Sequence, residues 1–134
     1  MPVSPDTMAA AASAPAGPYR IGALCRVFGV TPRALRYYEA CGLISPGRRG
    51  VERVYTRGDY HRLRVIVGCR EADLSLRQIK EVIDAYSRED HGQAQNTLAL
   101  SFLRGQADAL KARADRLESM IQGLEDPSHA ASAR

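Results

Sequence analysis

Residues 31–42 read TPRALRYYEACG, and the interpretation of the whole chain depends on this stretch. Thr31 is a residue type that caps helices well, and Pro32 suits the first helical position, where its missing N–H would have no partner. Gly42 follows the last periodic residue, at the position where a left-handed residue ends many helices. The stretch therefore predicts a short helix over residues 32–41.

The two faces of this predicted helix differ in character. With about 100° of rotation per residue, one face carries Leu35, Tyr38, Ala34 and Cys41, and the other carries Arg33, Arg36, Tyr37 and Ala40. The adjacent tyrosines therefore have different roles, since Tyr38 packs inward and Tyr37 stands among arginines. Arginine suits bidentate contact with phosphate or guanine, and a helix N-terminus offers unpaired N–H groups to phosphate. This division predicts a recognition helix for the DNA major groove.

Further helices are predicted on both sides of this one. Residues 19–29 (YRIGALCRVFG) place apolar side chains at helical spacing, and Gly29 ends the pattern shortly before the next helix begins. Two short helices joined by a tight turn that contains glycine are typical of a helix-turn-helix motif. Downstream, helical spacing recurs over residues 59–71 and 76–86, with Ser75 as the cap of the second segment.

A small wing is predicted between the recognition helix and the third helix. Residues 43–56 (LISPGRRGVERVYT) contain the turn-forming sequence PGRRG and end in an alternating pattern that is typical of a short strand. We expect a β-hairpin with Arg48 and Arg49 near its tip and Arg53 on its second strand. All three could follow a DNA backbone or enter a minor groove.

Basic charge is concentrated in this first part of the chain. Between Arg20 and Lys80 there are 13 Lys or Arg against 5 Asp or Glu, whereas the remainder has 6 basic and 10 acidic residues. Because the basic residues are almost all arginines, a polyanion is a better explanation than a merely solvated surface. Arg57, Arg62 and Arg64, near the start of the third helix, are expected to extend the basic patch.

The clearest periodicity follows a polar linker. Within residues 96–125, apolar or small residues recur every seven positions in two series. The series are Leu100, Ala107, Ala114 and Ile121, and Leu103, Leu110, Leu117 and Leu124. This seam predicts a coiled coil, and a homodimer is favoured because two-fold dimers dominate among soluble oligomers. Packing of the helix against its own domain is the alternative, and the charges leave the orientation of the two helices open.

Other classes of protein are not indicated. The histidines are scattered without carboxylates at ligand spacing, and no glycine-rich phosphate loop is present. Cys25, Cys41 and Cys69 are widely spaced, which favours small buried thiols over a disulfide framework or a metal site, with a redox role as the alternative. No apolar run approaches the length of a bilayer span. We expect a cytoplasmic protein that is not an enzyme, uses no cofactor or metal and does not contact a membrane.

The expected organisation is therefore a mainly α protein of two folded parts. Residues 19–86 form a winged helix-turn-helix head with a small hairpin wing, and residues 96–125 form a long coiled-coil dimerisation helix. Residues 87–95 link the two parts. Residues 1–18 are rich in Ala, Pro and Ser and lack the features of a signal peptide, so a disordered leader is expected, as is a flexible tail over residues 126–134.

Two motifs, RALRYYEACGLISP and RVYTRGDYHRLRVI, resemble the DNA-binding domain of MerR-type transcriptional regulators. The resemblance covers about residues 19–86, and the coiled-coil helix in its expected place extends it to about residue 124. It implies a winged-helix head, two wings and an antiparallel coiled coil that joins two heads. Such dimers bind pseudo-palindromic promoter operators as double-stranded DNA and distort them so that RNA polymerase can engage. Many repress when unliganded.

The resemblance also implies which residues contact DNA. By position in the motifs they are Thr31, Arg33, Arg36, Tyr37 and Tyr38 on the recognition helix and Arg53 and Tyr55 in the first wing. The family's usual Gly-Tyr-Arg wing is replaced here by the sequence VER at residues 51–53, and Asp73 stands where a helix-ending glycine is common.

The C-terminal part departs from several branches of the family. Metal-sensing members place cysteines near the dimer helix, whereas this sequence has none after Cys69. A metal, an iron–sulfur cluster or a large effector module is therefore not expected, while a small-molecule effector is left open. The segment SLRQIKEVIDAYSREDHGQ is similar to the short LiuR-like group, which regulates branched-chain amino-acid and related catabolic genes.

Two other functions compete with a promoter-specific regulator. A DNA-architectural or excisionase-like winged-helix protein would use the same arginines with low sequence specificity. A protein-interaction module would instead depend on the coiled coil.

Overall fold

The computed structural model describes residues 17–128, so most of the expected leader and tail lies outside the described residues. Within that range the chain is mainly helical, with one two-stranded hairpin. The elements are α2 (Ile21–Phe28), α3 (Pro32–Ala40), β1 (Gly47–Arg49), β2 (Glu52–Val54), α4 (Arg57–Glu71), α5 (Leu76–Asp84) and α6 (Gln93–Glu125). The predicted fold class, a winged helix-turn-helix head followed by a long helix, is confirmed.

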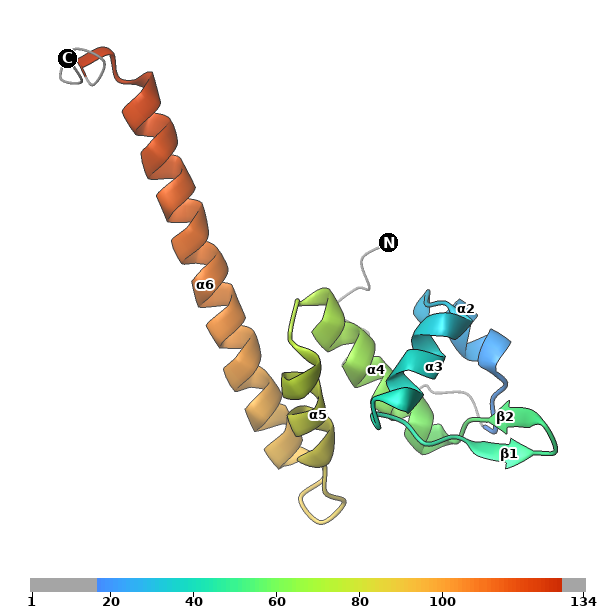
Figure 1. Cartoon of the computed structure of the whole chain (residues 1–134). Coiled ribbons are helices and arrows are strands. Elements are labelled where there is room, and N and C mark those ends of the chain that lie inside the picture. The colour runs from blue at the N-terminus through green and yellow to red at the C-terminus, as the bar shows by residue number, and fades with distance from the viewer. Residues whose placement is uncertain (1–16, 129–134) are drawn as a thin grey trace.

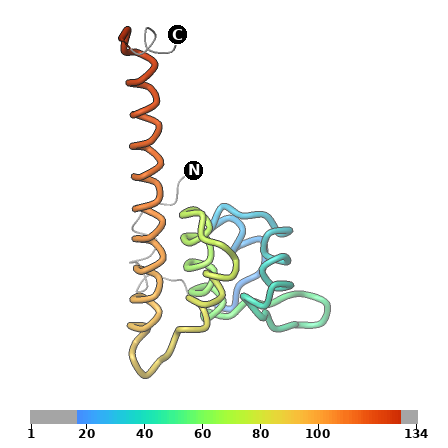
Figure 2. Tube along the Cα trace, turned by 60° about the vertical axis from the view of Figure 1, so that its left-hand side comes forward, coloured from blue at the N-terminus to red at the C-terminus, as the bar shows by residue number. Residues whose placement is uncertain are grey.

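The elements are arranged around α4. In Figure 1, α2 and α3 lie on one side of α4 and α5 lies on the other, while the hairpin projects beyond α3. Helix α6 runs beside α5 on the side remote from the hairpin and extends well past the head. Figure 2 shows the same arrangement from another direction, with the distal half of α6 apart from every other described segment. At about 1.5 Å per residue, the 33 residues of α6 span roughly 50 Å.

The helix-turn-helix forms through the local signals found in the sequence. Helix α2 ends at Gly29, whose φ of 64° lies in the left-handed region that glycine adopts without strain. At the start of α3, the Thr31 hydroxyl oxygen accepts a hydrogen bond from the Ala34 amide at 3.1 Å, and Pro32 occupies the first turn. The helix ends one residue earlier than predicted, with Cys41 as its C-cap, and Gly42 follows with a φ of 76°.

The hairpin is tied to the segment before α2. Strands β1 and β2 pair antiparallel, with Arg48 directly opposite Arg53. Beyond β2 the chain leaves the hairpin ladder, and Tyr55 exchanges backbone hydrogen bonds of 2.8 and 2.9 Å with Tyr19. The wing is therefore joined to the head at its base, while the turn at Gly50 projects outward.

The core of the head is apolar and continuous from α2 to α5. Its members include Leu24, Leu35, Leu63, Ile66 and Ile79, each with no exposed surface. Aromatic rings extend the core, because the Tyr60 ring lies 5.3 Å from that of Tyr19 and 5.0 Å from that of Phe28. This core holds α3 by one face only, so the opposite face is available at the surface.

Helix α4 begins at Arg57, two residues before the predicted start. The reason is a capping box, in which the Asp59 amide donates to the Thr56 hydroxyl at 3.1 Å and the Thr56 amide donates to the Asp59 carboxylate at 2.9 Å. Asp59 itself is buried. Helix α5 has the predicted Ser75 cap but ends at Asp84, shortly before the predicted boundary.

The predicted linker boundary is wrong, because α6 begins at Gln93 rather than at residue 96. The Asp90 carboxylate accepts hydrogen bonds from the Gly92 and Ala94 amides, both at 3.0 Å, and so satisfies N–H groups at the helix start. Gly92 adopts a φ of 77°, which turns the chain into the helix. The connection after α5 is thus a short, hydrogen-bonded turn.

The first turns of α6 are fixed to the head. The Gln95 side-chain amide donates to the Val82 carbonyl at 3.1 Å, and Ala99 is buried. Phe102 and Leu103 are half-buried against the head core. None of the helices in the described chain has the length and apolar character needed to cross a membrane.

Candidate nucleic-acid interface

The outward face of α3 carries the residues predicted for DNA recognition. Arg33, Arg36 and Tyr37 are exposed, and Thr31 is exposed at the N-cap. Tyr37 has 52% of its surface exposed, whereas Tyr38 has 8%. The predicted division between the adjacent tyrosines is confirmed. The inclusion of Tyr38 among the DNA contacts is corrected, because its ring packs into the core beneath α3.

Tyr55 also needs correction. The resemblance assigned it to the wing surface, but its side chain has no exposed area. Because the chain leaves the hairpin at this residue to pair with Tyr19, the ring turns into the head. Its hydroxyl has no hydrogen-bond partner among residues 17–128, and burial, reinforced by the nearby Glu39 charge, raises its pKa. Tyr55 is a core residue rather than a DNA contact.

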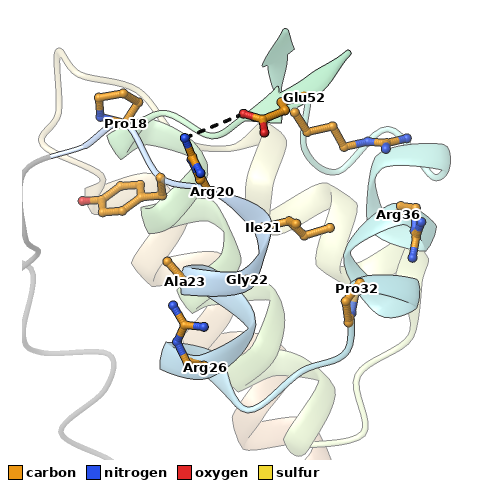
Figure 3. Close-up of a pocket in the computed structure, with 11 residues that line it drawn as sticks. Pro18, Arg20, Ile21, Gly22, Ala23, Arg26, Pro32, Arg36 and Glu52 are labelled. Atoms are coloured by element: carbon orange, nitrogen blue, oxygen red, sulfur yellow. Dashed lines mark ion pairs between the residues drawn. The ribbon is translucent and has the colours of Figure 1, made fainter. Parts of the chain in front are cut away.

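A groove of about 770 Å³ lies between the start of α2, the start of α3 and the hairpin. Its rim carries four arginines, Arg20, Arg26, Arg36 and Arg53. Small and apolar residues of α2, together with Pro32, form its walls, as Figure 3 shows for Gly22 and Ala23. One carboxylate, that of Glu52, lies 4.0 Å from Arg20, and both side chains are largely exposed. A concave surface with this excess of guanidinium groups suits phosphate oxygens.

The wing contributes arginines to the same side of the head. Arg48 and Arg49 are exposed on β1, as predicted. Arg53 is only half-exposed because its Nε atom donates to the Glu39 carboxylate at 2.8 Å. Glu39 is a member of this surface that the sequence did not reveal. Its partner Arg53 lies 14 residues further along the chain, on β2, and the position of β2 relative to α3 depends on the fold.

The three arginines in the first half of α4 have different environments. Arg57 is exposed, and Arg62 forms an ion pair with the buried Asp59 at 3.3 Å. Arg64 is buried, with its guanidinium carbon 5.3 Å from the centre of the Tyr60 ring, a cation–π geometry. The expectation that Arg64 extends the basic patch is therefore wrong.

The cysteines are free thiols, with Cys69 buried and Cys25 and Cys41 half-buried. Burial raises the pKa of Cys69, and it raises the pKa of Cys25 against the opposing effect of Arg26 and Arg36. A raised pKa lowers the thiolate fraction and hence the reactivity, which weighs against a redox role for these two thiols. Among residues 17–128, no three His, Cys, Asp or Glu side chains gather in a way that could hold a metal ion.

The predicted seam on α6 is largely exposed in the single chain. Leu103 packs against the head, but Leu110, Leu117, Ile121 and Leu124 have between 51% and 84% of their surface exposed. Leu100 is also exposed, as are Ala107 and Ala114. The alternative in which α6 packs on its own domain applies only to the first turns of the helix.

A recognition helix, an adjoining wing and a basic groove on one side of a helical head define a winged helix-turn-helix DNA-binding protein. The comparisons with known proteins agree with this class. Residues 19–86 match the family described as MerR HTH family regulatory protein, and residues 60–126 match that described as MerR, DNA binding.

Individual relatives lead to the same family. The ZntR regulator of Escherichia coli K12 is 31% identical over 109 residues, which cover 80% of this chain and 76% of that protein. A ZntR homolog from Haemophilus influenzae is 42% identical over 67 residues, but the match covers only 48% of this chain and 50% of that protein. The solved structure of HiNmlR, a MerR family regulator lacking the sensor domain, bound to promoter DNA, has a TM-score of 0.55 at 22% identity, over 81% of this chain and 82% of that one.

The chain belongs to the MerR family of transcriptional regulators. Members of this family bind DNA and are not enzymes.

Proposed function

We propose that this protein is a homodimeric, cytoplasmic regulator that binds a pseudo-palindromic promoter operator through two copies of α3 and distorts the DNA. The observation that carries the proposal is the position of Arg33, Arg36 and Tyr37, which stand exposed on α3 beside the basic groove and the wing. In this arrangement α3 enters the major groove while the surrounding arginines hold the flanking phosphates.

Each part of the surface has a distinct task. Arg33 and Arg36, in the first two turns of α3, reach base edges or phosphates, and the Tyr37 hydroxyl bonds a phosphate oxygen. Thr31 holds the helix start in place, so that its remaining N–H groups face the DNA backbone. Arg48, Arg49 and Arg53 extend the contact along the DNA from the wing.

The dimer forms through α6. A second copy of the exposed leucine seam would cover the first, and an antiparallel arrangement places one head at each end of the pair. Two identical heads then bind two related half-sites, which accounts for a pseudo-palindromic operator. Bending such DNA has a deformation energy that depends on its sequence, so that shape adds to specificity.

The proposed dimer acts at the promoter together with RNA polymerase, which engages the distorted DNA. A small-molecule effector is left open. The structural relative that was solved with promoter DNA supports the choice of a promoter as the target.

Footprinting the region upstream of the protein's own gene, against an excess of random competitor DNA, tests sequence-specific binding. A protected site with two related halves is expected. If protection does not exceed that on random DNA, the regulator is replaced by its alternative, a DNA-architectural protein of low specificity.

A double variant tests whether α3 makes the contacts. Arg33→Ala with Arg36→Ala should weaken operator binding by about 1–3 kcal/mol per lost contact. The matched control is Arg77→Ala with Arg88→Ala, which removes two exposed charges from α5 and the turn after it. If operator affinity falls equally in both double variants, long-range charge explains the loss, and α3 is not the element that contacts the operator.

A further inference from the structure

Strand pairing in the wing brings two like charges together. Arg48 on β1 lies directly opposite Arg53 on β2, so both side chains project from the same face of the hairpin. Like charges at directly opposed positions destabilise an antiparallel pair. The wing therefore needs a counter-charge on this face in order to hold its two arginines side by side.

Glu39, in the last turn of α3, supplies that counter-charge. One of its carboxylate oxygens accepts a hydrogen bond from Arg53 Nε at 2.8 Å, and the other lies 4.0 Å from an Nη atom of Arg48. The Glu39 and Arg53 side chains are only 26% and 28% exposed, so water screens this pair less than it screens the Arg20–Glu52 pair. A single carboxylate thus joins the recognition helix to both strands of the wing.

The contact through Nε also determines how the Arg53 guanidinium is presented. A guanidinium has five N–H donors, and the one on Nε is used by Glu39. No other described residue bonds to the four donors on the terminal nitrogens, which are left for another acceptor, and the direction of the planar group is fixed. An acceptor on the operator that approaches the groove beside Arg53 meets oriented donors rather than a freely rotating side chain.

We propose that Glu39 is a positioning residue for operator recognition, which sets the angle of the wing arginines Arg48 and Arg53 relative to α3. The inference rests on the proposed function, because it concerns the same DNA-binding surface. Glu39 itself does not contact DNA in this scheme. It acts through the two arginines, and its loss releases them from a common geometry.

Simple electrostatics makes the opposite prediction. Removal of a negative charge from a DNA-binding surface should tighten binding to every DNA, because repulsion of the phosphates falls. If Glu39 positions the wing arginines, Glu39→Gln should instead weaken operator binding, while binding to random DNA becomes no weaker. The ratio of the two affinities separates the two explanations.

The experiment measures operator and random-DNA affinity for wild-type protein, Glu39→Gln and Glu81→Gln. Glu81→Gln is the matched control, since it removes the same charge from a helix of the head but disturbs only the exposed pair with Arg77 on α5, at 3.6 Å. We expect Glu39→Gln to lower the operator-to-random ratio about tenfold, the size of one lost oriented contact. The ratio for Glu81→Gln should stay within about twofold of wild type.

A mutant cycle guards against a merely structural effect. Arg53→Ala is combined with Glu39→Gln, and circular dichroism confirms that each variant is folded. If Glu39 acts through Arg53, adding Glu39→Gln to Arg53→Ala should reduce operator affinity by less than about twofold more. Fully additive losses would overturn the inference.

The outcomes distinguish this inference from the function on which it rests. If wild-type protein binds no DNA fragment more tightly than random DNA, the proposed function is overturned, and the inference with it. Wild-type protein with a preferred operator, together with an unchanged or increased ratio for Glu39→Gln, overturns the inference alone. In the latter case Glu39 is an ordinary repulsive charge.

Discussion

In the head, Leu24, Leu35 and Leu63 have no exposed surface, whereas Leu110 and Leu117 on α6 each have 54% of theirs exposed. The head therefore gains the free energy of apolar burial, about 1.5–3 kcal/mol for each large side chain, within a single chain. The distal half of α6 does not. The same residue type stabilises folding in one region and is available for association in the other.

The difference separates two properties that one chain must combine. Head stability should be largely independent of protein concentration, because its core is complete. In the proposed dimer the distal part of α6 would depend on a partner, since most helical stability in proteins comes from packing of an apolar face. Substitutions in the two regions should accordingly change different measurements.

The largest effect is expected from Leu110→Glu. A charge in the centre of the exposed seam should prevent two copies from associating, so that sedimentation detects monomers, whereas a dimer is expected for the wild-type protein. Ala109→Glu, an exposed neighbour outside the seam, is the control and should remain dimeric. A dimer that persists in Leu110→Glu would remove the seam from the interface.

Leu63→Ala tests the head in the same way. Removal of a fully buried leucine side chain should cost about 2–5 kcal/mol of unfolding free energy, measured by urea denaturation at a fixed protein concentration. Leu124→Ala, at a position with 84% of its surface exposed, should change the unfolding free energy of the head by less than about 0.5 kcal/mol. Equal losses in the two variants would contradict the separation between head and distal helix.

A smaller effect is expected at the start of α4. Thr56→Ala removes the hydroxyl that accepts from the Asp59 amide, and loss of such a cap typically costs about 1 kcal/mol. Thr97→Ala on α6 removes an exposed hydroxyl that bonds only to its own helix, and should have little effect. Thermal unfolding of both variants measures the difference, and an unaltered melting temperature for Thr56→Ala would show that the cap is not needed.

The smallest effect concerns pH. Burial lowers the pKa of His61, and the positive charges of Arg64 and Arg57 lower it further. Above about pH 6.5, the usual histidine pKa, His61 is neutral in both the folded and the unfolded protein. As the pH falls below that value the unfolded chain takes up the proton first, so folding stability decreases until the folded-state pKa has also been passed.

A variant can assign this pH dependence to the head. His61→Gln should reduce the loss of melting temperature between about pH 7.5 and 5.5. An identical pH profile for His61→Gln would mean that other groups are responsible.

Much of the head could be predicted because its signals are local. The caps at Thr31 and Ser75 and the glycine after α3 each depend on residues within one turn of helix. The different roles of Tyr37 and Tyr38 follow from helical rotation alone. The capping box at the start of α4 is also a local pattern, TRGD at residues 56–59, and it starts the helix two residues earlier than the apolar spacing predicts.

Other features depend on contacts between distant segments and could not be predicted from a local pattern. The resemblance placed Arg53 and Tyr55 together in the first wing, but the strand ends at Val54 and Tyr55 pairs with Tyr19 instead. The bond between Glu39 and Arg53 required the angle between α3 and the hairpin. Arg64 belonged to an arginine-rich stretch, and only the tertiary structure placed it against the Tyr60 ring.

The fixed first turns of α6 have a consequence for the spacing of the half-sites that the protein can bind. With Gln95 bonded to α5 and Ala99 buried, the long helix leaves the head at one angle. A flexible tether would let two heads sample many separations, and each binding event would then lose entropy by selecting one of them. Because the first turns of α6 are fixed, the distance between the two heads of the proposed dimer would be constant and would match one spacing of half-sites. DNA whose half-sites have another spacing would bind one head only, or change shape to satisfy both.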